Sequence, residues 1–150
     1  MRRKAIPAGR ALLWLAAVAW VALLFVLLGQ EGAASSALSR RAARLVIGFF
    51  PFLNMSPAAL EPLLRKIAHG AVFAVEGFFL MLAAGASFGR GRGASFSLLA
   101  CSGMAVLSEL HQRGVAGRSC EAQDMLIDFC GALAGVLFAG LLLCFFHRGK

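Results

Sequence analysis

Long apolar stretches alternate with short polar ones along the chain, and this pattern predicts helices that cross a membrane. Residues 11–28 are eighteen consecutive positions without a charged or amide side chain. As an α-helix this stretch extends about 27 Å, close to the thickness of a bilayer core. Three more apolar stretches follow at about residues 67–86, 95–110 and 125–146. We therefore predict an all-α protein, an integral membrane bundle of four transmembrane helices that forms a single domain over residues 1–150.

Composition supports this membrane assignment. Hydrophobic residues make up 60% of the chain and charged residues 15%, whereas soluble domains carry about 25% charged residues. A cleaved signal peptide is the alternative for the first stretch, because residues 1–4 are basic and residues 33–37 are small. A signal peptide has an apolar core of only about 7–15 residues, so the longer stretch favours a retained helix.

The first polar connection, residues 30–65, contains a segment that can form a helix of its own. Between residues 37 and 50, apolar positions are interleaved with Arg40, Arg41 and Arg44. This pattern is typical of a short interfacial helix that lies on the membrane surface. An ordered loop packed on the helix ends remains an equal alternative, because amphipathicity alone is a weak marker.

The net charge of +8 reflects membrane topology better than nucleic-acid binding, because the basic residues gather at helix ends. Four spans place both termini on one side of the membrane. That side carries eight basic residues and no acid: Arg2, Arg3, Lys4, Arg10, Arg90, Arg92, Arg148 and Lys150. The other side carries the remaining seven, mostly in a long loop that translocates with less regard to charge. We expect cytoplasmic termini and no nucleic-acid partner.

Ionisable side chains converge on the opposite, non-cytoplasmic face, where the second stretch begins, the third ends and the fourth begins. Glu76 and Asp128 lie deepest, and a charge near the bilayer centre costs about 2.5–3.5 kcal/mol, so each needs a partner or a function. Arg118 is the expected partner of Asp124 or Glu109. The predicted polar cluster is Arg65, Lys66, His69, Glu76, Glu109, His111, Gln112, Arg118, Asp124 and Asp128.

A purely structural interpretation of this cluster stays open. Arg65 and Lys66 can extend to lipid phosphates, and His69 can hydrogen-bond between helices. In that case the cluster is a polar plug that locks four helices together. The sequence contains no HExxH motif and no Cys/His zinc spacing, so we expect no metal and no cofactor.

Small residues mark a close helix contact in the fourth stretch. Gly131 and Gly135 form a GxxxG motif, which Ala139 extends by four positions. Such stripes let helix backbones approach closely in membranes. The contact is either internal to the bundle or the interface of a homodimer.

The polar residues also carry a family resemblance. The run RKIAH at residues 65–69 resembles the R-K-x-x-H motif of the VanZ-like membrane proteins, a family named for a teicoplanin-resistance protein. The second motif of that family, E-x-x-Q…G-R…D-x-x-[ND]-x-x-G, is similar to Glu109–Gln112, Gly117-Arg118, Asp124 and Asp128-x-x-Gly131. The resemblance covers about residues 11–146. It implies a multi-pass bacterial inner-membrane protein of the cell envelope that is connected with antibiotic resistance through glycopeptide (teicoplanin) susceptibility.

Some positions depart from the family pattern. The family often has an aromatic residue after the histidine, where this chain has Gly70, and proline before Gly-Arg, where this chain has Ala116. The first helix ends in Leu28-Gly29-Gln30 instead of a Ser-Ser-Gln-like sequence. A substrate or partner can therefore differ from that of the resistance protein.

Three functions fit these observations. The preferred one is a non-enzymatic membrane protein that contacts lipids and binds a lipid-linked or cell-wall-related ligand at the polar cluster, with arginines pairing with phosphate or carboxylate. The alternative is an enzyme acting on a lipid phosphate or ester, with His69 as base or nucleophile and Asp124 or Asp128 orienting it or holding a metal. A proton-coupled carrier using Glu76 and Asp128 is a weaker option, because the four spans show no internal repeat.

Overall fold

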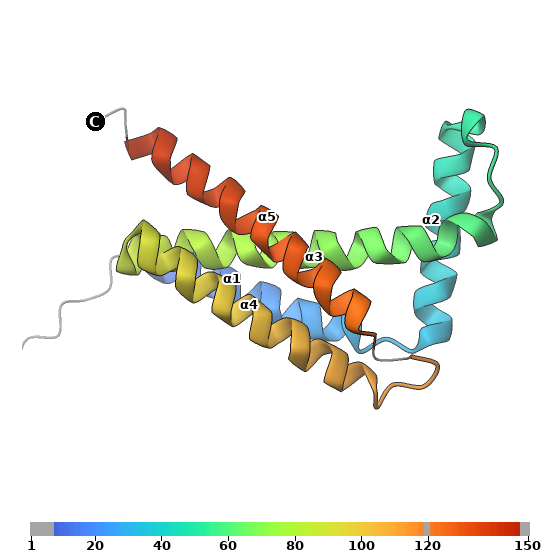
Figure 1. Ribbon diagram of the computed structural model, residues 1–150, viewed down its shortest axis with the longest axis horizontal. Coiled ribbons are helices and arrows are strands. Elements are labelled where there is room, and N and C mark those ends of the chain that lie inside the picture. The colour runs from blue at the N-terminus through green and yellow to red at the C-terminus, as the bar shows by residue number, and fades with distance from the viewer. Residues whose placement is uncertain (1–7, 119–120, 148–150) are drawn as a thin grey trace, which may run out of the picture.

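A computed structural model describes residues 8–118 and 121–147, which form an all-helical protein (Figure 1). The elements in chain order are α1 (Ala8–Leu28), α2 (Gly32–Phe49), the 3-10 helix η1 (Pro51–Leu53), α3 (Pro57–Phe88), α4 (Arg90–Gln112) and α5 (Ala122–His147). By length and composition, α1, α3, α4 and α5 can each cross a membrane. This confirms the predicted fold class.

Helix α3 begins well before the apolar stretch that predicted it. The Ser56 hydroxyl accepts a hydrogen bond from the Ala59 amide at 3.2 Å, and Pro57 occupies the first helical turn. Both features favour a helix start. With 32 residues, α3 extends about 48 Å at 1.5 Å per residue, which exceeds a bilayer core of about 30 Å. Its first turns therefore extend beyond the other spans and carry polar side chains.

Helix α2 covers the predicted helical segment except its last residue and starts five residues earlier. It crosses the bundle at a steep angle and packs near the start of α3 (Figure 1). Ala43 is fully buried in this contact, while Leu38, Leu45 and Phe49 remain exposed. The helix thus packs on the bundle and also presents an apolar surface, and its placement at a membrane interface stays a prediction.

Consecutive long helices run antiparallel, so the beginning of α1 and the end of α5 lie at the same end of the bundle (Figure 1). Near that end the Trp14 indole donates to the Ser87 hydroxyl at 3.0 Å and joins α1 to the end of α3. Most of the basic residues assigned to this side lie outside the described residues: Arg2, Arg3, Lys4, Arg148 and Lys150. The opposite end brings together the end of α1, the end of α4 and the beginning of α5, beside α3.

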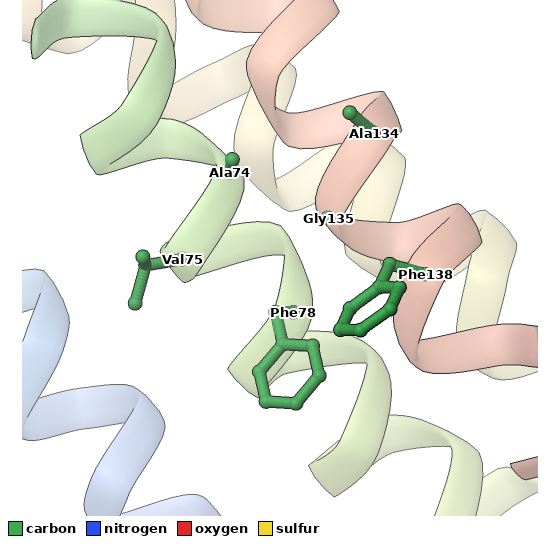
Figure 2. Close-up of a pocket in the computed structure, with 6 residues that line it drawn as sticks. All are labelled: Ala74, Val75, Phe78, Ala134, Gly135 and Phe138. Carbon is green, nitrogen blue, oxygen red and sulfur yellow. The ribbon is translucent and has the colours of Figure 1, made fainter. Parts of the chain in front are cut away.

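The small-residue stripe of α5 is used inside the chain. A Cβ atom added to Gly135 would lie 1.9 Å from the Ala74 carbonyl oxygen, and one added to Gly131 would lie 2.1 Å from the Gly70 carbonyl oxygen. Figure 2 shows Gly135 facing α3 beside Ala74 and Phe78. Both glycines therefore contact α3 within the chain, and a homodimer stays a prediction.

Candidate functional site

Three ionisable side chains from three helices meet inside the bundle. His69 of α3, Glu109 of α4 and Asp128 of α5 are all buried, and each places one nitrogen or oxygen atom within 4.8 Å of the other two. The His69 Nδ1 atom lies 3.2 Å from Asp128 Oδ1. Gly131 contacts the α3 backbone at Gly70, so α3 and α5 approach closely one residue after His69 and three after Asp128. The glycine contact thus brings the histidine and the aspartate within reach.

The connection between α4 and α5 folds back onto this cluster. Glu109 Oε2 accepts a hydrogen bond from the Glu121 amide at 2.9 Å, and Gln112 Oε1 accepts one from Arg118 Nη1 at 3.0 Å. We expected Arg118 to pair with Asp124 or Glu109. Within the described residues it forms no ion pair within 4.0 Å and bonds to the amide of Gln112 instead.

Backbone geometry explains the shape of this connection. Gly117 has φ +72°, a left-handed conformation that favours glycine. A Cβ atom on Gly32 would lie 2.2 Å from the Gly117 carbonyl oxygen, and the Gly32 amide donates to the Ala116 carbonyl at 3.0 Å. The loop is therefore clamped against the start of α2, and it holds Arg118 beside α2 and α3.

A pocket of about 210 Å³ lies between α1, α2, α3 and this loop. Arg65, His69 and Arg118 make part of its lining polar, and leucine and valine side chains make another part apolar. The full lining is Leu27, Leu28, Gln30, Ser35, Leu38, Ser39, Arg65, Ala68, His69, Val72 and Arg118. The pocket therefore combines two guanidinium groups with a hydrocarbon wall.

The two arginines in the pocket retain unused hydrogen-bonding capacity. Arg65 Nη2 contacts Glu61 Oε1 at 3.1 Å and also donates to the Ser36 hydroxyl. The Nε atoms of Arg65 and Arg118 are shielded from solvent and have no hydrogen-bond partner among the described residues. Burial and the positive charge of Arg65 lower the pKa of Arg118. An anion in the pocket would relieve this repulsion.

The other predicted residues lie around this centre. The Lys66 ammonium donates to the Gln123 side-chain oxygen at 2.7 Å and faces a different surface hollow. Glu76 is buried two turns along α3, and Asp124 is half-buried at the start of α5. His111 is exposed and packs edge-on against the Phe25 ring, at a centroid distance of 6.1 Å. The structure thus joins most of the predicted cluster but leaves Lys66 and His111 at its margin.

Sequence reasoning missed the contribution of α2 to the pocket. Ser35, Leu38 and Ser39 form one wall, and Ser36 binds Arg65. The serines were visible in the sequence, but their relation to α3 depends on the angle at which α2 packs. A second pocket, of about 380 Å³, lies between α3 and α5 and is lined by apolar residues and glycine (Figure 2). None of these lining residues has a polar side chain that could bind or react with a ligand.

Glu61 anchors the α2 wall. Its two carboxylate oxygens accept from Arg40 of α2 at 3.2 Å and from Arg65 at 3.1 Å. We predict that Glu61→Gln increases amide hydrogen exchange in α2 by about fivefold, as expected for a local loss of about 1 kcal/mol. The helices of the bundle should keep their exchange rates. Arg41→Gln, at an exposed position of α2, is the matched control, and equal acceleration in both variants would contradict the anchoring role.

The comparisons with known proteins agree with the resemblance noted in the sequence. A family model described as VanZ/LLP1 matches residues 13–143. No curated protein and no solved structure matches the chain. The match covers the four long helices nearly end to end, together with α2 and all residues of the cluster.

Proposed function

Because this chain belongs to the VanZ/LLP1 family, we propose that it is a cell-envelope membrane protein that binds an anionic, lipid-linked ligand in the pocket between α1, α2 and α3. The ligand class is a cell-wall-related lipid whose head group carries a phosphate or a carboxylate. Binding of this ligand would affect susceptibility to glycopeptides such as teicoplanin. The proposed location is the bacterial inner membrane, with cytoplasmic termini and the pocket on the opposite face.

One observation carries the proposal: two arginines with unpartnered Nε donors line a pocket whose lining also includes leucine and valine side chains. Guanidinium groups bind phosphate and carboxylate through paired, charge-assisted hydrogen bonds. Each such bond contributes about 1.5–3 kcal/mol. The polar wall therefore suits an acidic head group.

The apolar wall suits the lipid part of the same ligand. Leu27 and Leu28 of α1, Leu38 of α2 and Val72 of α3 line it. The end of α1 lies beside the crosswise helix α2 (Figure 1). A ligand with its head group at the arginines can therefore place its first hydrocarbon units between α1 and α2. A soluble anion would use only half of this surface.

The binding test uses purified protein in nanodiscs with a polyprenyl phosphate as probe, and the matching polyprenol as the uncharged comparison. We expect binding of the phosphate only. Arg65→Gln/Arg118→Gln should weaken it about 100-fold, because two charge-assisted bonds are lost. Arg41→Gln/Arg44→Gln removes the same charge from exposed positions of α2 and should change affinity less than threefold. Equal affinity for polyprenol, or equal losses in both double variants, would refute the proposal.

The cellular arm measures teicoplanin susceptibility in cells that express the wild type or either double variant at matched membrane levels. The wild type should alter susceptibility, and Arg65→Gln/Arg118→Gln should abolish the effect. If the pocket variant keeps the full effect, the ligand pocket has no part in it.

A second function is favoured by the buried His69–Asp128 contact at 3.2 Å beside the pocket. In an enzyme acting on a lipid phosphate, Asp128 would hold the imidazole while the other ring nitrogen acts as base or nucleophile. Release of inorganic phosphate from a polyprenyl phosphate by purified protein, abolished by His69→Ala, would establish this alternative. Binding without turnover would favour the non-enzymatic function.

A further inference from the structure

The buried cluster of His69, Glu109 and Asp128 has the donor set of a metal site. One nitrogen and two carboxylate oxygens come from α3, α4 and α5 and lie within 4.8 Å of one another. The relative exposures are 5% for His69 and 0% for both acids. Metal bonds of about 2.0–2.2 Å place neighbouring ligand atoms about 3–3.5 Å apart around a tetrahedral ion. Small side-chain rotations would bring the three atoms to that spacing.

Each carboxylate in the cluster keeps one oxygen without a partner. Glu109 Oε1 and Asp128 Oδ2 are shielded from solvent and accept no hydrogen bond from the part of the chain that is described. Their second oxygens are held, by the Glu121 amide in one case and by His69 in the other. The Ser108 hydroxyl lies close to Asp128 but donates to the Ala105 carbonyl at 2.9 Å. The acids are therefore oriented by one oxygen and free to bind through the other, as in sites where outer contacts position metal ligands.

Charge balance also calls for a cation. Glu76 and Asp124 are further acids close to Asp128, and no Lys or Arg of the described ranges forms an ion pair with any of these acids within 4.0 Å. The nearby basic residues have other partners: Arg65 binds Glu61 and Ser36, Lys66 binds Gln123, and Arg118 binds Gln112. Ionised carboxylates inside a membrane bundle are costly unless a positive charge lies beside them. A divalent ion would neutralise two of them.

We propose that His69, Glu109 and Asp128 bind one divalent first-row metal ion, with Zn²⁺ as the simplest occupant. Zinc accepts imidazole nitrogen and carboxylate oxygen together, whereas Mg²⁺ and Ca²⁺ prefer oxygen alone. Three protein ligands leave a coordination position open. His69 also lines the arginine pocket, so the proposed metal site and the pocket share one side chain.

No short sequence motif predicts this metal site. The three ligands are separated by 40 and 19 positions along the chain, whereas zinc motifs recognisable in sequence have ligands a few residues apart. The absence of HExxH led us to expect no metal. The fold instead assembles the donor set from three helices, which spacing rules within one helix do not detect.

The test is metal binding by the full chain, purified in detergent without a polyhistidine tag and stripped with chelator. Co²⁺ titration followed by visible absorption, and Zn²⁺ content by elemental analysis, should each give one ion per chain. Glu109→Gln and Asp128→Asn keep side-chain size. They should weaken binding more than about 100-fold, since changes even to outer contacts of metal sites cost about 10–100-fold.

Matched controls separate the cluster from general acidity and from the pocket. Glu61→Gln removes an acid elsewhere on α3 and His111→Gln removes an exposed histidine, and both should bind the ion as the wild type does. Arg65→Gln/Arg118→Gln should also retain it, so loss of ligand binding and loss of metal binding are distinguishable.

Two results would overturn the metal site. One is failure of the stripped wild type to take up one equivalent of Co²⁺ or Zn²⁺ at micromolar concentration. The other is unchanged uptake by Glu109→Gln and Asp128→Asn. If a variant unfolds, the wild-type protein still tests the metal site. Bound Zn²⁺ should raise the melting temperature of the wild type, and chelator should reverse the shift.

Discussion

Replacing Gly135 by alanine is expected to lower the free energy of unfolding by about 3 kcal/mol, at the upper end of the usual cost of overpacking. The added Cβ atom would lie 1.9 Å from the Ala74 carbonyl oxygen and 2.9 Å from the Phe78 amide nitrogen. Both atoms belong to the backbone of α3, so no side-chain rotation can remove the clash (Figure 2). The helices must separate, which weakens the packing that holds membrane helices together.

Thermal unfolding in detergent, followed by circular dichroism and by retention of a monodisperse peak, measures this effect. Gly103→Ala is the matched control. A Cβ atom there meets no other atom within 4 Å, and alanine is the better helix former. We expect that variant to be neutral or slightly stabilising. Equal stability of the two variants would mean that α3 and α5 do not cross at Gly135.

Removing the Phe73 ring is the second change with a large expected effect. Phe73 is fully buried one helical turn beyond His69, in a cluster with Leu24 and Leu28 of α1 and Ala105 of α4. Phe73→Ala should destabilise the protein by about 3 kcal/mol, the low end for buried phenylalanine. In a bilayer the transfer part is small, because lipid tails are as apolar as the core. The remaining cost comes from the cavity and the lost contacts.

Phe145→Ala makes the same change at a site that is 84% exposed, so it should leave stability nearly unchanged. The comparison uses the same thermal measurement. A loss of stability confined to Phe73→Ala would confirm that α1 packs on α3 and α4 beneath the cluster. Similar small losses at both positions would contradict that packing.

The length of the apolar stretches by itself determined the fold class and the four membrane-spanning helices. Stretches such as residues 11–28 are too long and too apolar for any other environment, and bilayer thickness sets their length. The sequence also placed the ends of the spans correctly relative to each other, because four antiparallel helices bring alternate ends to one face. That rule predicted that His69, Glu109 and Asp128 would lie at the same end of the bundle.

The exact partners were decided by tertiary structure. Arg118 bonds to Gln112 instead of an acid, and Lys66 points away from the pocket. Such choices depend on distances of a few ångströms, whereas helical spacing fixes only which residues share a face. Helix α3 also begins earlier than predicted, because Ser56 and Pro57 form a helix start outside the apolar stretch.

The pocket and the donor set of the proposed metal site likewise required the fold. The pocket depends on the steep angle of α2, which its amphipathic sequence does not encode (Figure 1). The donor set depends on Gly131 admitting the Gly70 backbone, which draws Asp128 toward His69. The sequence determined which chemical groups enter this end of the bundle, because hydrophobic patterning is local. Only close packing between helices decided which groups meet, because that contact joins residues far apart along the chain.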